Sequence, residues 1–513
     1  MPFLTTWIVL AICAGFLWAQ SRRSRGFPLP PGPKKWPIVG NAFQMPRYHE
    51  FLTFTEWKKT WGNYIYLRVF GLDLLVINSY KVAKELLEKR SDHFSDRPRL
   101  IMAGEMMGWN KATAISPFNN DFKNHRRLLA RTVGGKNAER FWPVEERERR
   151  KFLLHIFEEP NNLIQLIRRL EGSVILDVSH GYTVQKNADP FVVMAETCMD
   201  QFSASTTYGA YMVEIFPFMR YIPEWLPGGQ FKKIAREWGG NLRRTIEEPF
   251  AFVKQEMAAN RARSSFASQM LTAADEDEEL IKAAAFSLYT GETGVPILRV
   301  FNSTKAVSAL TMFFLLMVLN PEAQRKAQAE IDELTKGQYL PTLQDRSKLP
   351  YTDAVMLESL RWGPIAPMAF PHRSTSEDIF EGYRIPEGIL CLPNLWAMMH
   401  DPEYYSDPME FKPERFMKDP PELDPRNIVF GFGRRICPGR SLADSGVWLT
   451  IALVLATCNI GKGVDENGNE VDPVVKFTSG TICRAEEFKY SIKPRSEKAV
   501  QLVKESQLDY NVL

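Results

Sequence analysis

The stretch Phe430-Gly431-Phe432-Gly433-Arg434-Arg435-Ile436-Cys437-Pro438-Gly439 places one cysteine in a glycine-rich loop, before an apolar helical run over 441–455. Gly433 and Gly439 permit backbone conformations and close approaches that a Cβ atom would block. Such a loop can lie against a flat cofactor and direct backbone N–H groups at a thiolate. A helix dipole also favours the anionic form of a cysteine just before the helix N-terminus. The alternative is a buried cysteine in a tight turn, but the full pattern predicts a thiolate site at Cys437.

Two further motifs precede this loop. Glu358-Ser359-Leu360-Arg361 places an acid and a base three residues apart, so on a helix they share a face and can pair. In Phe411-Lys412-Pro413-Glu414-Arg415-Phe416, Arg415 can complete a bidentate fork on the same carboxylate. The alternative is an exposed pair, which stabilises a helix by only about 0.3–0.5 kcal/mol.

The patterns F-x-x-G-x-R-x-C-x-G, E-x-x-R and P-E-R-F, in this order and spacing, resemble those of the cytochrome P450 superfamily. The phrases LPPGPKKWPIVGN, FSDRP, LPYTDAVMLESLRW and FTSG are similar to fungal microsomal members that act on secondary metabolites and xenobiotics. The resemblance covers nearly the whole chain and implies the cytochrome P450 fold. It also implies haem b as cofactor, Cys437 as the axial iron ligand, and a buried Glu358–Arg361–Arg415 triad that holds the haem loop.

The resemblance further implies which residues contact the haem. They are Phe430, Gly433, Arg435 and Gly439 in the loop, with Arg126, His372 and Arg373 as further partners of the propionates. Relatives usually carry a tryptophan where this chain has Phe122, so one propionate is expected to lose an indole N–H donor.

The implied activity is that of a monooxygenase, because an anionic sulfur ligand favours cleavage of the O–O bond. The chain has no flavin- or nucleotide-binding glycine motif, so an NADPH–cytochrome P450 reductase is the expected electron donor. A basic docking face for it is predicted near the loop, from Lys123, Arg126, Arg127, Arg434 and Arg440. The balance of 64 basic against 61 acidic residues argues against nucleic acid as a partner. The expected substrate is a lipophilic small molecule.

The family's oxygen-site relay is altered here. The expected place reads LYTGETGVP over 288–296, in which Glu292-Thr293 is a plausible acid–alcohol pair. Pro296 follows closely, and the position 16 residues before Pro321 holds Lys305 instead of threonine. Residues 294–302 therefore read as an insertion or as an error in the gene model. This leaves two alternatives open: a haem-thiolate lyase or isomerase that needs no O₂, or a haem-binding protein inactivated by the insertion.

Hydrophobic periodicity predicts a mainly α-helical fold with a minor β region. Strand patterns occur at 64–70 and 72–78, and an almost wholly apolar run over 306–319 predicts a helix buried through the domain centre. No linker or repeat divides the chain from residue 40 to residue 490, so 42–513 is expected to form one catalytic domain.

The N-terminus predicts a membrane anchor. Residues 3–19, FLTTWIVLAICAGFLWA, are uncharged and apolar, close to the roughly 20 residues that span a bilayer. The basic residues come after this run, whereas a cleaved signal peptide carries them before it. We therefore expect an anchor with its basic flank over 1–26, a proline-rich spacer over 27–41, and a catalytic domain on the cytoplasmic side of the endoplasmic reticulum membrane. The apolar stretch from Val213 to Gly229 is the candidate for a second membrane contact.

Overall fold

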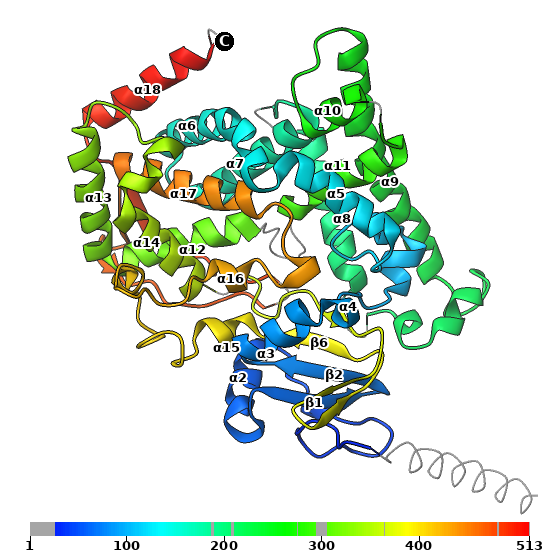
Figure 1. The fold of residues 1–513 in the computed structure, drawn as a ribbon. Coiled ribbons are helices and arrows are strands. Elements are labelled where there is room, and N and C mark those ends of the chain that lie inside the picture. The colour runs from blue at the N-terminus through cyan, green and yellow to red at the C-terminus, as the bar shows by residue number, and fades with distance from the viewer. Residues whose placement is uncertain are drawn as a thin grey trace, which may run out of the picture.

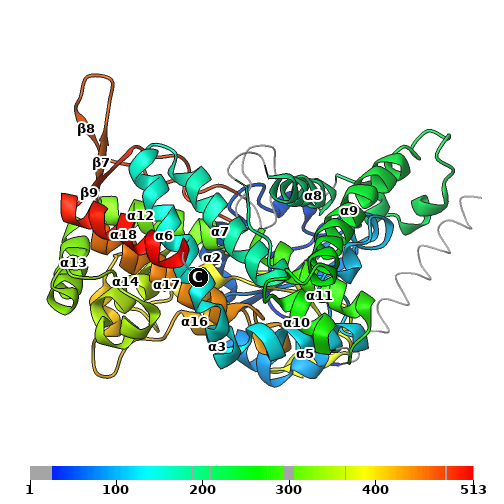
Figure 2. The same ribbon diagram turned by 90° about the horizontal axis from the view of Figure 1, so that it is seen from above.

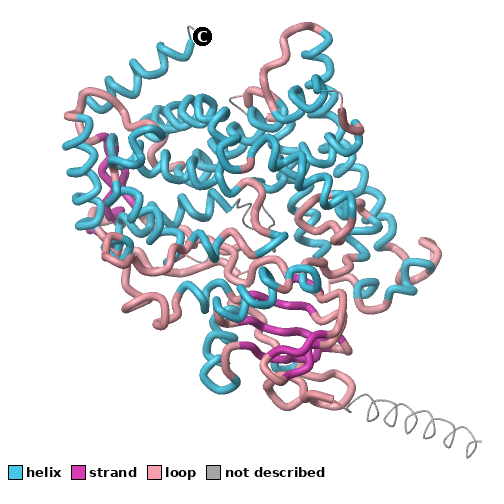
Figure 3. The backbone as a smooth tube through the Cα atoms, in the orientation of Figure 1, coloured by secondary structure: helices cyan, strands magenta, loops and turns pink. Residues whose placement is uncertain are grey.

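The computed structural model describes residues 26–185, 189–206, 210–273, 275–293, 305–363, 365–479 and 482–511. Helices form most of this part, and three small sheets lie at its edges (Figures 1 and 3). The predicted mainly helical fold with a minor β region is confirmed. The longer helices are α2 (Glu50–Trp61), α5 (Asn120–Val133), α6 (Trp142–Glu158), α7 (Leu163–His180), α8 (Pro190–Thr206), α9 (Phe231–Ala258), α10 (Phe266–Ala273), α11 (Glu278–Thr293), α12 (Lys305–Leu319), α13 (Pro321–Thr335), α14 (Pro350–Trp362), α17 (Arg440–Thr457) and α18 (Glu497–Asn511).

Shorter elements connect the long helices. Single-turn helices are α3 (Tyr80–Ala83), α4 (Ser91–Phe94), α15 (Leu395–Met399) and α16 (Arg426–Val429), and π-helical turns span Lys84–Lys89 and Ile101–Met106. The strands are β1 (Tyr64–Val69), β2 (Leu72–Ile77), β3 (His372–Arg373), β4 (Asp378–Phe380), β5 (Tyr383–Ile385), β6 (Leu390–Pro393), β7 (Cys458–Val464), β8 (Glu470–Val471) and β9 (Tyr490–Pro494).

Helix α12 forms the centre of the core. All residues from Ala306 to Val318 are buried, and the helix packs against α7, α14 and α17. A helix that is apolar on every side loses most free energy when exposed to water, so the middle of the domain is its stable place. The predicted buried helix over 306–319 is therefore confirmed. Figure 2 shows α12, α14 and α17 from above, in the left part of the molecule.

The largest sheet has the strand order β1-β2-β6-β3. Strands β1 and β2 form a hairpin whose two turn residues, Phe70 and Gly71, both have positive φ, as a type I′ turn requires. Strand β2 then pairs in parallel with β6, with Leu74 opposite Leu390. The predicted strands over 64–70 and 72–78 are confirmed, and this sheet lies below the helices in Figure 1.

The proline-rich segment lies along this sheet. Pro31 O accepts the Tyr66 N–H at 2.8 Å, and Pro28 O accepts the Arg384 N–H at 2.8 Å. A Cβ atom at Gly32 would lie 2.0 Å from Tyr66 O, so glycine permits this close approach. From Pro28 onward the predicted spacer is thus bonded to the catalytic domain.

The predicted anchor over residues 3–19 lies outside the described residues. Within the described ranges from residue 26 on, no single helix is long and apolar enough to cross a membrane; α12 and α13 meet that measure only as a pair bent by 105°.

Candidate functional site

The Cys437 loop lies between α16 and the N-terminus of α17 (Figure 1). The Cys437 N–H donates to Phe430 O at 2.8 Å, which closes the loop. Gly433 has φ +54°, and a Cβ atom there would lie 2.2 Å from Leu87 O, so the packing of this loop on the π-helical turn Lys84–Lys89 requires glycine. Gly439, in contrast, caps α17 with φ −86°, a conformation open to any residue.

Positive groups surround the half-buried Cys437. Arg126 on α5 donates from Nη1 to Ile436 O at 2.6 Å, one residue before the cysteine. Burial lowers the pKa of Arg126, and the attraction of Cys437 opposes that shift. The N-terminus of α17 begins three residues after Cys437, at Arg440. Both features stabilise a thiolate at this position.

Arg435 is buried beside the loop. Its guanidinium donates to three backbone carbonyls, Ser95 O at 2.7 Å, Thr113 O at 3.2 Å and Ser116 O at 2.8 Å. It also lies 3.8 Å from the centre of the Phe122 ring, so the phenylalanine supports this arginine through its π face. Burial lowers the pKa of Arg435 to about 10.

A second buried guanidinium, that of Arg97, lies next to it. Arg97 donates to Ala114 O at 2.8 Å, Phe370 O at 2.9 Å and Pro371 O at 2.7 Å. Its pKa falls because of burial and the repulsion of Arg435. In the described part of the chain neither arginine forms an ion pair with a carboxylate. Buried charges are normally paired, so these two are suited to an anion from outside the chain.

The two predicted residues of β3 have different surroundings. His372 is buried, and its Nδ1 lies 2.7 Å from Phe94 O. Burial, together with the charge of Arg97, lowers the pKa of His372 to about 3, so this imidazole is neutral. Arg373 pairs with Asp96 at 3.2 Å, and 42% of its side chain is exposed. Arg373 therefore lies outside the buried cluster of Arg97 and Arg435.

The structure brings Glu358, Arg361 and Arg415 together. Arg361 forms two bonds to the carboxylate, at 2.7 Å from Nε and 2.8 Å from Nη2. Arg415 contacts Glu358 through Nε alone, at 3.1 Å, and its Nη1 donates to Glu422 at 2.6 Å. Arg415 therefore bridges two carboxylates, whereas the sequence predicted a bidentate fork on Glu358.

Comparison with known proteins agrees with this geometry. A family model described as "Cytochrome P450" matches residues 30–479. The chain belongs to the cytochrome P450 family. It is 43% identical over 501 residues to cytochrome P450 monooxygenase 208 of Postia placenta, covering 96% of each chain. It is also 42% identical over 483 residues to cytochrome P450 monooxygenase claR of Ampulloclitocybe clavipes, covering 93% of this chain and 88% of the relative. The protein is a cytochrome P450 monooxygenase.

Membership of the P450 family implies a haem-thiolate cofactor, and the residues present fit it. Cys437 would supply the sulfur, and Arg97 and Arg435 are buried cations without a carboxylate partner among the described residues. A haem carries two propionates, which would supply the missing negative charge.

Next to these arginines is a small cavity of about 60 Å³. Residues that line it supply backbone carbonyls to which Arg97 and Arg435 donate. Its walls come from segments far apart in the P450 sequence and are largely apolar: Trp109, Ala112, Ile115, Met199, Phe202, Phe370 and Ile482. Ser287, Thr290 and Lys305 add polar groups from α11 and α12. This is the candidate substrate cavity.

The predicted relay pair Glu292–Thr293 ends helix α11, but the side chains of both residues lie outside what the structure describes, as do residues 294–302. Their catalytic role stays a prediction.

Sequence reasoning missed Arg97 as a site residue, although the phrase FSDRP that contains it supported the resemblance. An arginine followed by proline is typical of an exposed turn. The burial of Arg97 depends on backbone carbonyls that lie 17 and 273 residues away in the chain.

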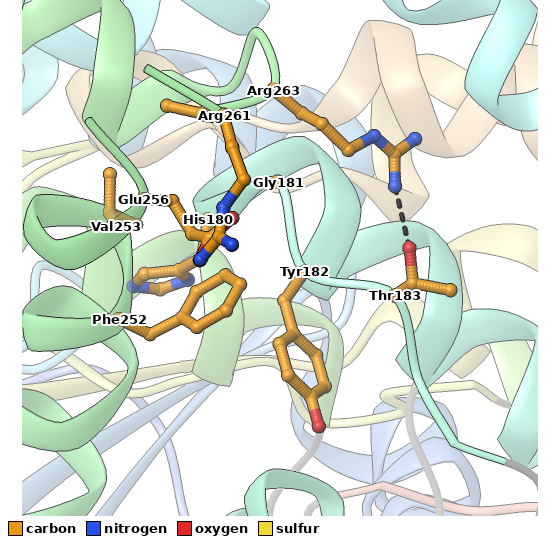
Figure 4. Close-up of a pocket in the computed structure, with 10 residues that line it drawn as sticks. His180, Gly181, Tyr182, Thr183, Phe252, Val253, Glu256, Arg261 and Arg263 are labelled. Carbon is orange, nitrogen blue, oxygen red and sulfur yellow. Dashed lines mark hydrogen bonds and ion pairs between the residues drawn. The ribbon is translucent and has the colours of Figure 1, made fainter. Parts of the chain in front are cut away.

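A second cavity, of about 270 Å³, lies between the C-terminal ends of α7 and α9 (Figure 4). His180, Tyr182 and Phe252 line it, and Arg261 and Arg263 lie at its edge. None of the predicted site residues lines this cavity, and it is separate from the Cys437 loop.

Proposed function

We propose that this P450 inserts one oxygen atom from O₂ into a lipophilic small molecule, a secondary metabolite or a xenobiotic. Its electrons come from NADPH through a cytochrome P450 reductase, and its cofactor is haem b with Cys437 as the axial ligand. The observation that carries the proposal is the Cys437 loop beside two buried arginines that have no carboxylate partner among the described residues.

The chain's own residues account for three parts of this activity. When bound, a thiolate-ligated haem supplies O₂ activation. Arg97 and Arg435 would hold the propionates, while Arg126 and the N-terminus of α17 favour the anionic form of Cys437. The apolar cavity would exclude water and orient the substrate near the haem.

The surface near Cys437 carries basic residues, which favour binding of an acidic redox partner. Of the predicted basic residues, Arg127 pairs with Glu276 and Arg434 pairs with Asp92. Lys123 is exposed, and Arg440 lies against the ring of Phe430, 5.6 Å from its centre. Lys123 and Arg440 are thus the residues we assign to docking of a reductase.

The test is reconstitution of the full-length holoenzyme with NADPH and a fungal cytochrome P450 reductase on a panel of terpenes, polyketides and aromatic compounds. We expect a product that carries one atom from isotopically labelled O₂, and no product under nitrogen. Product formed without O₂ or reductase would support a lyase or isomerase instead. Haem binding without any product would support the inactivated protein.

The expected location is the endoplasmic reticulum membrane, with residues 3–19 as a single span. An exposed apolar group supports a second contact: Phe218, Tyr221 and Trp225 are 65%, 71% and 81% exposed, in the segment that leads into α9. Exposed aromatic residues of this kind favour a membrane interface. Figure 1 shows this segment projecting from the right of the molecule.

Deleting residues 1–26 should move most of the protein from the membrane pellet to the supernatant without loss of haem, because the bonds of the proline-rich segment to the catalytic domain, at Pro28 O and Pro31 O, remain. Replacing Phe218 and Trp225 by serine in the truncated chain should release the remainder, since both side chains are exposed and leave the core intact. The measurement is sedimentation after a carbonate wash, with haem content as the control. A truncated chain that sediments wholly with membranes contradicts the anchor.

A further inference from the structure

Lys305, the first residue of α12, places a cation in the wall of the substrate cavity. It stands at the position where the sequence comparison with the family expected an alcohol. The side chain is half-buried, and Nζ lies 5.3 Å from the centre of the Phe370 ring. Contact with an aromatic face stabilises an ammonium group less than an ion pair with a carboxylate does.

The described residues offer Lys305 no acid. Among them, no aspartate or glutamate lines the cavity, and no carboxylate forms an ion pair with Lys305. Arg97 donates to the carbonyls of Ala114 and Phe370, which both line the cavity, but its charge is assigned above to a haem propionate. Lys305 is therefore the cation in this wall that has no acidic partner among the described residues.

An unused hydrogen-bond donor lies in the same wall. The indole N–H of Trp109 is buried and has no acceptor among the residues that the structure describes, while the centre of its ring lies 4.5 Å from that of Phe202. Ser287 and Thr290 are already occupied, with bonds to Ala283 O and Phe286 O. Of the described residues in this cavity wall, Lys305 and Trp109 are thus the donors without a strong acceptor.

A wholly apolar substrate would remove water from the Lys305 ammonium without giving it a new partner. This desolvation is unfavourable. A substrate with a carboxylate would pair with Lys305 in a weakly screened environment, where charge-assisted bonds are strong. Aromatic and aliphatic walls at the same time favour an apolar body.

We propose that this cavity, with its volume of about 60 Å³, receives the carboxyl end of lipophilic carboxylic acids and selects for it, with the carboxylate on Lys305 and the adjoining apolar atoms against Trp109, Phe202 and Phe370. This substrate class rests on the proposed monooxygenase function and narrows it. Lys305 is then a specificity-determining residue where the family's relay alcohol was expected.

The test measures binding, not turnover. The probes are para-pentylbenzoate and decanoate, each paired with its primary amide, which keeps the shape and removes the charge. Calorimetric titration of the full-length holoenzyme, without reductase or NADPH, should show each acid binding at least about tenfold more tightly than its amide. In Lys305→Met the acids should lose about ten- to a hundredfold in affinity, and the amides should change little. Lys305→Arg should keep the preference.

The matched control is Lys493→Met, which removes the same charge from an exposed position on β9 and should change nothing. Acids that bind no better than their amides, or a preference that survives in Lys305→Met, overturn the proposal. Haem lost from Lys305→Met, with acid preference unchanged in the remaining holoenzyme, would assign the ammonium to haem and also overturn it. Acid-selective binding together with failed reconstitution would overturn the monooxygenase proposal and leave the cavity's selectivity standing.

Discussion

Replacing Cys437 with alanine should abolish thiolate ligation, and the reduced carbon monoxide complex should lose its red-shifted absorption band. The loop from Phe430 to Gly439 contains no other soft anionic ligand. Other cysteines cannot substitute easily, because burial raises the pKa of the Cys391 and Cys458 thiols to about 12. Activity should fall below detection with the band, since the thiolate drives O–O cleavage.

A matched control is Cys458→Ala, which removes a buried thiol at the far end of α17. The 18 residues of this helix separate the two positions by about 27 Å at a rise of 1.5 Å per residue. Its spectrum should equal that of the unmodified protein. A thiolate band that persists in Cys437→Ala would show that another residue ligates the iron, and would refute the assignment of Cys437.

The features that were predicted correctly from the sequence are determined by residues that lie close together in the chain. The Cys437 loop combines glycines, an arginine and a cysteine within ten residues, and its glycine at 433 has a visible structural reason. The run over 306–319 is apolar on every side, so only a buried helix satisfies it. The β1–β2 hairpin likewise follows from two strand patterns, over 64–70 and 72–78, that Gly71 separates.

The features that it missed depend on contacts across the chain. Strand β2 pairs with β6 across more than 300 residues of sequence, and no local pattern specifies that partner. Arg415 divides its donors between Glu358 and Glu422, because the path of the loop around Ser406 brings Glu422 within reach. The cavity wall is assembled from Trp109, Phe370 and Lys305, which only the folded chain brings together.

Glycines and charges in the site were harder to interpret than the cysteine. Gly439 resembles Gly433 in the sequence, yet only Gly433 has a left-handed backbone conformation. Arg373 and Arg435 both looked like partners of a propionate, but Arg373 already pairs with Asp96. A residue type at a given spacing therefore indicated the chemistry of the site, and burial decided which side chains remain available for it.

Glu358 carries a negative charge that two buried arginines share. Glu358, Arg361 and Arg415 are each at most 1% exposed. The carboxylate accepts bonds from both guanidinium groups and from the Lys412 N–H at 2.7 Å. Through these bonds α14 holds the loop that contains Arg415, and this loop leads toward the Cys437 loop.

Glu358→Gln should therefore lower the free energy of unfolding by about 3–5 kcal/mol, because it keeps the size of the side chain but leaves two buried cations underpaired. Haem content should fall with stability, since the haem loop depends on the neighbouring segment. Glu358→Asp keeps the charge on a shorter side chain. Its free energy of unfolding should lie between those of the unmodified protein and Glu358→Gln. Chemical denaturation followed by circular dichroism, with haem content measured in parallel, gives the comparison.

Glu422→Gln is the matched control for that loss. Glu422 also accepts a bond from Arg415, at 2.6 Å, but its side chain is 14% exposed, and Arg415 would retain Glu358. We expect a loss of at most about 1–2 kcal/mol, because water can partly replace the exposed partner. If Glu358→Gln unfolds at the same denaturant concentration as the unmodified protein, or no earlier than Glu422→Gln, the triad does not hold the haem loop. A large loss confined to position 358 would instead show that one buried carboxylate on α14 keeps its helix neighbour Arg361, the distant Arg415 and the loop that contains Arg415 in place.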